Sequence, residues 1–146
     1  MPSQTFTHRS TTSAPVSEVW SALDRPQTWE AIGGVDRVFD PEIDDEGLLQ
    51  GFSFETVAGG KRYVGVATPH RRVTGETMAW EIANSEVRGV TSVELSGDGE
   101  WTVITVTLEV RSAGFLSSMF FPVITKAIGN GLPRSVDDFA ASFDRA

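Results

Sequence analysis

The sequence predicts an α+β fold in which one strand and two short helices precede an antiparallel meander and a long C-terminal helix. The meander is indicated by β-rich runs between residues 35 and 111, which short turns separate. Residues 101–111 alternate cleanly between apolar and polar side chains, which is typical of a strand with one buried face. The closing helix is indicated over residues 115–143 by apolar side chains that recur every three or four positions.

The N-terminal elements follow from short local signals. Residues 3–12 alternate loosely and are expected to form a strand near a sheet edge. A helix is predicted next, because Pro15 suits a first helical turn, where its missing N–H has no intrahelical partner. A second short helix is expected to start at Pro26, with Asp24 as its cap. The apolar anchors of the two helices are Val16, Val19, Trp20, Leu23, Trp29 and Ile32, and both tryptophans are expected to be structural.

Five strands account for the meander. They are expected at residues 49–57, 62–68, 77–83, 87–95 and 101–111. Since the turns between them are short, successive strands are expected to pair antiparallel. Three glycines inside the strands are expected to permit bulges and bending of the sheet, namely Gly51, Gly65 and Gly89.

The C-terminal helix is expected to be amphipathic and irregular. Pro122 and Pro133 each lack a backbone N–H, so a kink is expected near each of them. A full break at residues 129–131, which contain two glycines, is the alternative. The apolar stripe comprises Phe120, Ile124, Ile128, Leu132, Val136, Phe139 and Phe143.

The composition excludes several classes of function. A net charge of −8 repels nucleic-acid phosphates and anionic membrane surfaces, so neither is expected as a partner. The chain has no cysteine and only two histidines, which rules out thiolate chemistry and a three-histidine zinc site. Residues 40–47 are acidic, but Asp45 stands where an EF-hand loop needs glycine, so a solvated loop is expected rather than a metal site. No phosphate-binding glycine motif occurs, and no cofactor is expected.

The chain of 146 residues shows no repeat, linker or low-complexity tract, so one domain is predicted over residues 1–146. No signal-peptide pattern and no run of 18 apolar residues occurs. Membrane insertion is therefore not expected, and the default location is cytoplasmic. The oligomeric state stays open.

One motif carries a family resemblance. Residues 14–24 read Ala-Pro-Val-Ser-Glu-Val-Trp-Ser-Ala-Leu-Asp and are followed by Trp29. Gly97-Asp98-Gly99 precedes the last strand, and Leu132-Pro133-Arg134 lies in the final helix. With the order of the elements, this pattern resembles START-like (SRPBCC) domains, most of all the polyketide cyclase/dehydrase and lipid-transport group. The resemblance covers essentially the whole chain.

The resemblance implies a helix-grip fold, in which a curved antiparallel sheet of six or seven strands wraps a long C-terminal helix. It also implies an apolar cavity between sheet and helix that takes lipids, hormones, quinones or polyketides. A cavity is expected on physical grounds too, because a strongly bent sheet and one helix cannot close as tightly as two flat layers.

The expected cavity walls are apolar positions that alternation or helical spacing sends to the shared interior. They are Phe52, Phe54, Met78, Trp80, Ile104, Val106, Phe120 and Ile124. Aromatic rings and methionine suit a pliable apolar pocket, although the same residues would serve equally as simple core packing. Tyr63, the only tyrosine, would orient a ligand carbonyl or hydroxyl if it faces inward, and would otherwise lie on an exposed strand face.

Charged residues of the strands fall out of phase with these apolar positions. Glu55, Glu81, Arg88 and Glu94 are therefore expected to face solvent, where they can form cross-strand charge pairs. Residues 70–72, His-Arg-Arg, are expected to form a solvated strand edge, with steering of an anionic ligand as the alternative. No acid–base set is expected inside the cavity.

Three functions stay open at this point. The absence of an inward acid–base set favours a non-catalytic module that holds a small hydrophobic molecule, such as a lipid or polyketide-like compound. The second is an aromatase/cyclase or dehydratase that folds a reactive chain inside the cavity. The third is a regulator with a vestigial cavity that binds another protein through its surface.

Overall fold

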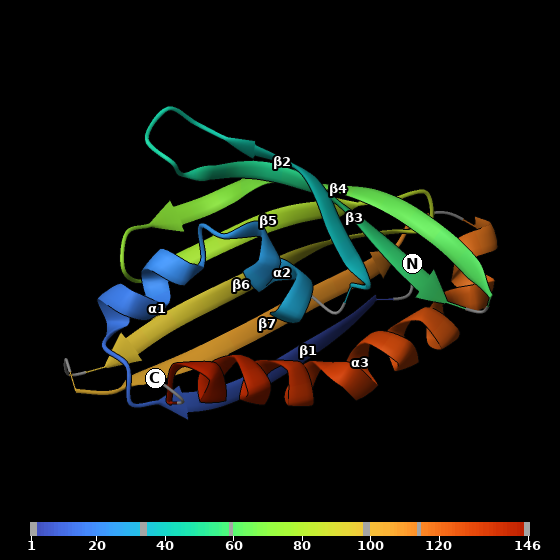
Figure 1. The fold of residues 1–146 in the computed structure, drawn as a ribbon. Coiled ribbons are helices and arrows are strands. Elements are labelled where there is room, and N and C mark those ends of the chain that lie inside the picture. The colour runs from blue at the N-terminus through green and yellow to red at the C-terminus, as the bar shows by residue number, and fades with distance from the viewer. Residues whose placement is uncertain (1–2, 33–34, 59, 98–99, 114, 145–146) are drawn as a thin grey trace.

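The computed structural model describes residues 3–32, 35–58, 60–97, 100–113 and 115–144. The side chains of residues 58, 115–125 and 127–129 lie outside that description. Within the described residues the chain forms seven strands and three helices (Figure 1). The strands are β1 (Ser3–Thr12), β2 (Arg37–Ile43), β3 (Leu49–Ala58), β4 (Lys61–Val73), β5 (Thr77–Ala83), β6 (Val87–Gly97) and β7 (Thr102–Ser112). The helices are α1 (Val16–Ala22), α2 (Pro26–Ile32) and α3 (Phe115–Asp144).

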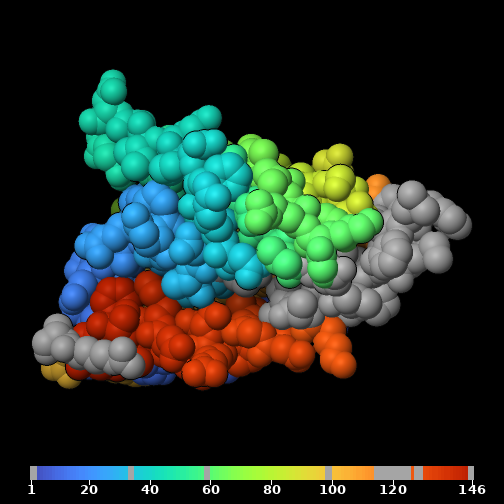
Figure 2. All heavy atoms as spheres, turned by 45° about the vertical axis from the view of Figure 1, so that its right-hand side comes forward, coloured from blue at the N-terminus to red at the C-terminus, as the bar shows by residue number. Residues whose placement is uncertain are grey.

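The strands build one antiparallel sheet with the order β1-β7-β6-β5-β4-β3-β2. Tight turns enforce the meander. Between β5 and β6, for example, the side-chain oxygen of Asn84 accepts hydrogen bonds from the backbone N–H groups of Glu86 and Val87. The segment with α1 and α2 carries the chain from the β1 edge of the sheet to the β2 edge, and the turn between β2 and β3 projects from the body (Figure 2).

The three helices lie on the same face of the sheet (Figure 1). α3 packs mainly against β1 and β7, whereas α2 packs against α3, β2 and β3. Along β7, buried residues alternate with more exposed ones from Thr102 to Ser112, so the predicted inner face of this strand is confirmed. The predicted fold class is confirmed as well, since a curved antiparallel sheet of seven strands carries a long C-terminal helix.

The structure corrects three expectations about the backbone, namely the acidic loop, the bulges at glycines and the alternative of a broken C-terminal helix. Residues 37–43, partly assigned to an acidic loop, form the edge strand β2, with a bulge between Phe39 and Glu42. The bulges of the sheet lie there, opposite Gly51, and between Pro69 and Arg71, rather than at the other two glycines. α3 runs unbroken through residues 129–131, because neighbouring helical turns on both sides support these residues. Its first turns still lean away from the line of the rest (Figure 1).

The expected capping role of Asp24 is also wrong. Oδ1 of Asp24 accepts hydrogen bonds from Nη2 of Arg72 at 2.8 Å and from the backbone N–H of Leu49 at 3.2 Å. Nη2 of Arg72 also donates to the carbonyl oxygen of Leu49 at 3.0 Å. Asp24 binds these distant partners rather than capping α2, because a hydrogen bond between a guanidinium and a carboxylate is stronger than one to a local backbone N–H. The α1–α2 corner is thereby fastened to β3 and β4.

The end of α3 is fastened to the segment that follows β1. Oδ1 of Asp144 accepts hydrogen bonds from Oγ1 of Thr12 and the backbone N–H of Ser13, both at 2.9 Å, and from Oγ of Ser13. The hydrogen bonds from the side chain and backbone of Ser13, and then from Thr12, hold the pKa of Asp144 below its ordinary value of 3.8.

The replacement Asp144→Ala should destabilise the protein at neutral pH and matter progressively less in acid. The folded pKa lies below the unfolded one, so this carboxylate contributes its full stability above the unfolded pKa, near 3.8. That contribution is lost as the pH falls through the folded pKa. Urea unfolding of both proteins at pH 7, 5, 3 and 2 checks this. Asp138→Ala is the control, because Asp138 is exposed and its ion pair with the exposed Arg134 is long at 4.0 Å and therefore weak. A pH-independent difference would contradict the assignment.

The two tryptophans of the short helices should differ in their effect on stability. Trp29 is 1% exposed, whereas Trp20 is only partly buried against the core. Trp29→Ala should therefore lower the free energy of unfolding by about 3–5 kcal/mol, and Trp20→Ala by clearly less. Chemical denaturation of the two variants tests the order, and a larger loss for Trp20→Ala would be inconsistent with it.

Candidate functional site

The inner face of the sheet carries the candidate site. Six of the expected wall residues belong to one buried cluster, and each is 6% exposed or less. They are Phe52, Phe54, Met78, Trp80, Ile104 and Val106. Each lies where strand alternation sends it inward, because alternate residues of a strand point to the same face. The side chains of Phe120 and Ile124, the expected opposite wall, lie outside the described residues.

Three aromatic rings form the centre of this cluster. The rings of Phe52 and Trp80 meet edge to face with centroids 5.3 Å apart, and those of Trp29 and Trp80 do so at 5.9 Å. Trp29 and Phe52 are stacked at 6.3 Å. These are favourable arrangements for aromatic pairs, since the positive edge of one ring faces the negative face of another. The three rings thus join the strands β3 and β5 to the helix α2.

The two buried indoles differ in their hydrogen bonding. Nε1 of Trp29 donates to the carbonyl oxygen of Leu23 at 2.7 Å. Nε1 of Trp80 is the one buried side-chain nitrogen or oxygen of the described residues for which no hydrogen-bond partner is found. An unpaired buried donor costs about 1–3 kcal/mol, so it requires a physical explanation.

A small cavity lies beside the aromatic centre. Its volume is about 20 Å³, and its lining comprises Trp29, Val35, Phe52, Phe54, Ile82 and Thr91. That volume accommodates about one water molecule. The sequence reasoning named only the two phenylalanines as part of it. Ile82 was within reach, because it follows Met78 and Trp80 in the same alternation, and Thr91 is the cross-strand partner of Trp80.

Gly65 makes room for one of these walls. A Cβ atom at this position would collide with the ring of Phe54 and with the carbonyl oxygen of Ala83. The role of this glycine is therefore close packing on the inner face rather than bending of the strand.

Tyr63 faces inward but belongs to a second group. It is partly buried against Val87, Leu108 and Val110, with Ile82 in contact with both groups. The alternative of an exposed strand face is thereby wrong. Tyr63 lies on β4 near the turn to β3 and is not among the residues that line the cavity.

The comparisons with known proteins address the fold. The Zhui aromatase/cyclase from Streptomyces sp. R1128 is similar with a TM-score of 0.64 and 14% identity, over 90% of this chain and 92% of that chain. A START superfamily protein from Mycobacterium smegmatis is similar with a TM-score of 0.58 and 8% identity, over 89% of this chain and 97% of that chain. A major latex-like protein from Panax ginseng is similar with a TM-score of 0.55 and 10% identity, over 88% of this chain and 96% of that chain. No protein-family profile and no curated protein matches the sequence.

The chain has the START-like helix-grip fold. The resemblance drawn from the residues 14–24 motif is thereby confirmed at the level of the fold. At 8–14% identity these likenesses establish the fold and assign no residue roles to this chain.

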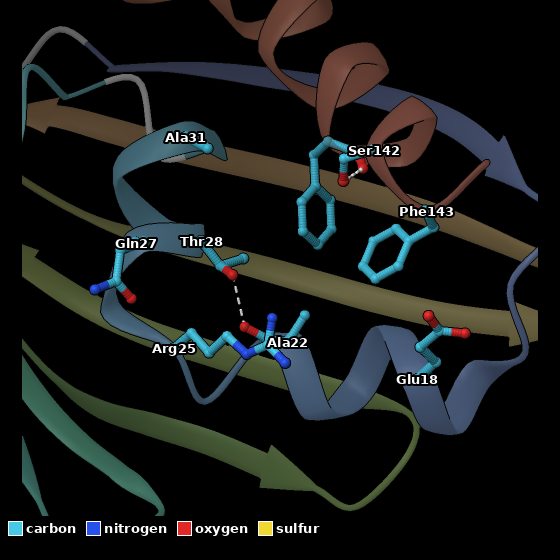
Figure 3. Close-up of a pocket in the computed structure, with 9 residues that line it drawn as sticks. Glu18, Ala22, Arg25, Gln27, Thr28, Ala31, Ser142 and Phe143 are labelled. Atoms are coloured by element: carbon cyan, nitrogen blue, oxygen red, sulfur yellow. Dashed lines mark hydrogen bonds between the residues drawn. The ribbon is translucent and has the colours of Figure 1, made fainter. Parts of the chain in front are cut away.

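A larger hollow opens between the short helices and the end of α3 of this START-like fold (Figure 3). Its volume is about 400 Å³, and polar and apolar groups line it in similar measure. Phe139 and Phe143 meet edge to face at 5.1 Å on the α3 side, and Thr28 donates to the carbonyl oxygen of Ala22 on the other side. Arg25 lies at the rim. Sequence reasoning missed this hollow, because it joins residues more than 100 positions apart.

Among the described residues, no titratable side chain lines the small cavity. Glu55 forms an ion pair with Arg62 at 3.1 Å, and Glu81, Arg88 and Glu94 are exposed, as their alternation predicted. Arg72 of the expected solvated edge is instead paired with Asp24. Nε2 of His8 lies 2.8 Å from Oδ1 of Asp137, which links the β1 edge to α3 in partly exposed surroundings.

Two further findings concern the described part of the chain. No three His, Cys, Asp or Glu side chains gather there closely enough to hold a metal ion. None of its helices is both long enough and apolar enough to cross a membrane.

Gly65→Ala should lower the free energy of unfolding by about 1–3 kcal/mol, because the added methyl group forces Phe54 or the strand to move. Gly131→Ala is the matched control. Nothing lies within 4 Å of a Cβ at this position in α3, so alanine should stabilise the helix by about 0.5–1 kcal/mol. Thermal and urea unfolding of the two variants measure the contrast, and equal effects would show that Phe54 is not tightly held.

Proposed function

We propose that this protein binds a small hydrophobic molecule, a lipid or polyketide-like compound, between the inner face of the sheet and α3. The observation that carries the proposal is the aromatic centre of Trp29, Phe52 and Trp80 beside a cavity, on an inner face that is apolar from β3 to β7. Pockets for small molecules are mostly apolar, with few polar groups that fix orientation. Thr91 and Tyr63 are such groups here.

The energetics support a moderate affinity. Each 100 Å² of apolar ligand surface that leaves water contributes about 2.5 kcal/mol. Loss of translational freedom and ordering of side chains offset much of that gain, so micromolar dissociation constants are expected. The 20 Å³ cavity is smaller than any such ligand, so side chains around it must move apart on binding. Met78 and the rotatable phenylalanines suit that adjustment.

A carrier function agrees better with the buried groups than an enzymatic one. The buried polar residues described are Thr12, Thr28, Thr91, Thr102 and Ser112, and none of them titrates near neutral pH. The similarity to an aromatase/cyclase keeps an enzyme as the alternative, in which the cavity would act by folding a reactive chain. The ligand and a cytoplasmic location stay predictions.

One surface feature favours interaction with another protein as a second candidate. Val57, Val64 and Val66 are 49–55% exposed and lie together on the outer face of β3 and β4. An exposed apolar group of this kind is typical of a contact surface. If that is its role, Val64→Asp with Val66→Asp should abolish self-association or partner binding in sedimentation experiments and leave ligand uptake unchanged.

The replacement Ile82→Trp should block ligand uptake. Ile82 lines the cavity and is only partly buried, so a larger ring there fills the space without opening the rest of the core. We expect binding of the apolar dye Nile red to weaken at least tenfold in a fluorescence titration, with an unchanged circular dichroism spectrum.

Glu94→Gln is the control for that titration, because Glu94 is exposed on β6 and should not affect binding. Native mass spectrometry of the purified wild type should in addition reveal copurified hydrophobic molecules. Equal dye binding by the wild type and Ile82→Trp would contradict the interior site and favour the surface function.

A further inference from the structure

We propose that the N–H group of Trp80 recognises an oxygen acceptor on the ligand, so that the site selects hydrophobic molecules bearing a carbonyl or ether oxygen. The inference rests on the proposed interior binding site and goes beyond it, because it states which chemistry distinguishes the ligand from a plain hydrocarbon. Trp80 is 1% exposed, and its Nε1 atom has no hydrogen-bond partner among the described residues.

Among the described residues, the ring neighbours of Trp80 and its inward neighbours on β5 offer no good acceptor. Its closest aromatic neighbours, Trp29 and Phe52, meet it nearly at right angles, and a ring face accepts a hydrogen bond only weakly. Its inward neighbours on β5 are the apolar residues Met78 and Ile82. The donor therefore lies in an apolar environment, where a hydrogen bond to an incoming oxygen gains most.

The cavity adjoins the two aromatic neighbours of Trp80 but is not lined by Trp80 itself, so these side chains must part before a ligand oxygen reaches the donor. Trp29 and Phe52 contact Trp80 and also line the cavity. Thr91, opposite Trp80 on β6, lines it from the sheet side and supplies a hydroxyl. A ligand whose apolar body parts the aromatic side chains thus brings its oxygen next to a donor that has been unpaired until then.

The contrast with Trp29 sharpens the assignment. The N–H group of Trp29 is already bound to the carbonyl oxygen of Leu23, although the two indoles touch and are equally buried. A donor with a purely structural role has a partner inside the fold, as Trp29 does. The donor of Trp80 has its partner supplied from outside.

A pair of shape-matched probes tests the inference, 2-acetylnaphthalene with a carbonyl group and 2-isopropylnaphthalene without one. Binding of both to the wild type and to Trp80→Phe is measured by calorimetry or dye displacement. Comparing the two ratios of dissociation constants cancels the different water solubilities of the probes. We expect Trp80→Phe to reduce the relative preference for the ketone about tenfold, as the loss of one buried hydrogen bond predicts.

Trp29→Phe is the matched control. It removes a satisfied N–H group from the same cluster, so it should lower stability and keep the preference for the ketone. Trp80→Phe should lower stability less than Trp29→Phe, since both variants lose buried ring volume but only Trp29→Phe also loses a hydrogen bond. Equal loss of preference in both variants would overturn the inference, because the preference would then follow from the shape of the cluster.

Nuclear magnetic resonance gives a second measurement that needs no folded variant other than the wild type. The indole ¹H–¹⁵N resonance of Trp80 should move downfield on addition of the ketone and much less with the hydrocarbon. If both probes bind and this resonance responds equally to each, the inference fails while the proposed binding function stands. If neither probe binds at millimolar concentration, the binding function itself fails.

Discussion

One long helix and two short ones have to cover the inner face of a seven-stranded sheet, and the rest of the structure depends on how that face is closed. α3 packs mainly on β1 and β7, and α2 reaches β2 and β3. Large side chains of β3 and β5 must therefore occupy the space between the helices, and Phe52 and Trp80 do so against Trp29 of α2. A close-packed core tolerates few voids, and a small cavity remains beside this cluster.

Charged hydrogen bonds hold the helices in the position that this closure requires. Arg72 ties the α1–α2 corner to β3 and β4 through Asp24 and the backbone of Leu49. Asp144 ties the end of α3 to Thr12 and Ser13. An acidic residue is unfavourable at the C-terminal end of a helix, yet the pKa of Asp144 is lowered, so its hydrogen bonds outweigh the helix dipole. The two ties fix the ends of the helical layer and leave its middle to apolar packing, which adapts more easily to a ligand.

Much of the fold and part of the site follow from local patterns. Period-two alternation placed Phe52, Met78 and Ile104 inward, because the pleat of a strand leaves only two directions for side chains. The strand β2 was not predicted, because Asp40 and Pro41 are typical of a loop and only the pairing with β3 makes them part of an edge strand. The partners of Asp24 and the hollow lined by Phe143 depend on contacts between distant residues, which no window along the chain contains. The state of hydrogen bonding at Trp80 likewise exists only once the interior is assembled.

The unpaired N–H group of Trp80 sets the stability of the core against the binding of a ligand. Stability favours a core in which every buried donor is paired, as at Trp29, and an unpaired indole N–H reduces a total stability of only about 5–15 kcal/mol. Phenylalanine at position 80 would avoid that cost, but it would leave a void where the larger indole now packs. A ligand oxygen that accepts a hydrogen bond from Trp80 would recover the cost on binding. Two ties by charged side chains, at Arg72 and at Asp144, support the fold beside this cluster, and the first adjoins it, because Asp24 follows Leu23, whose carbonyl oxygen binds Trp29.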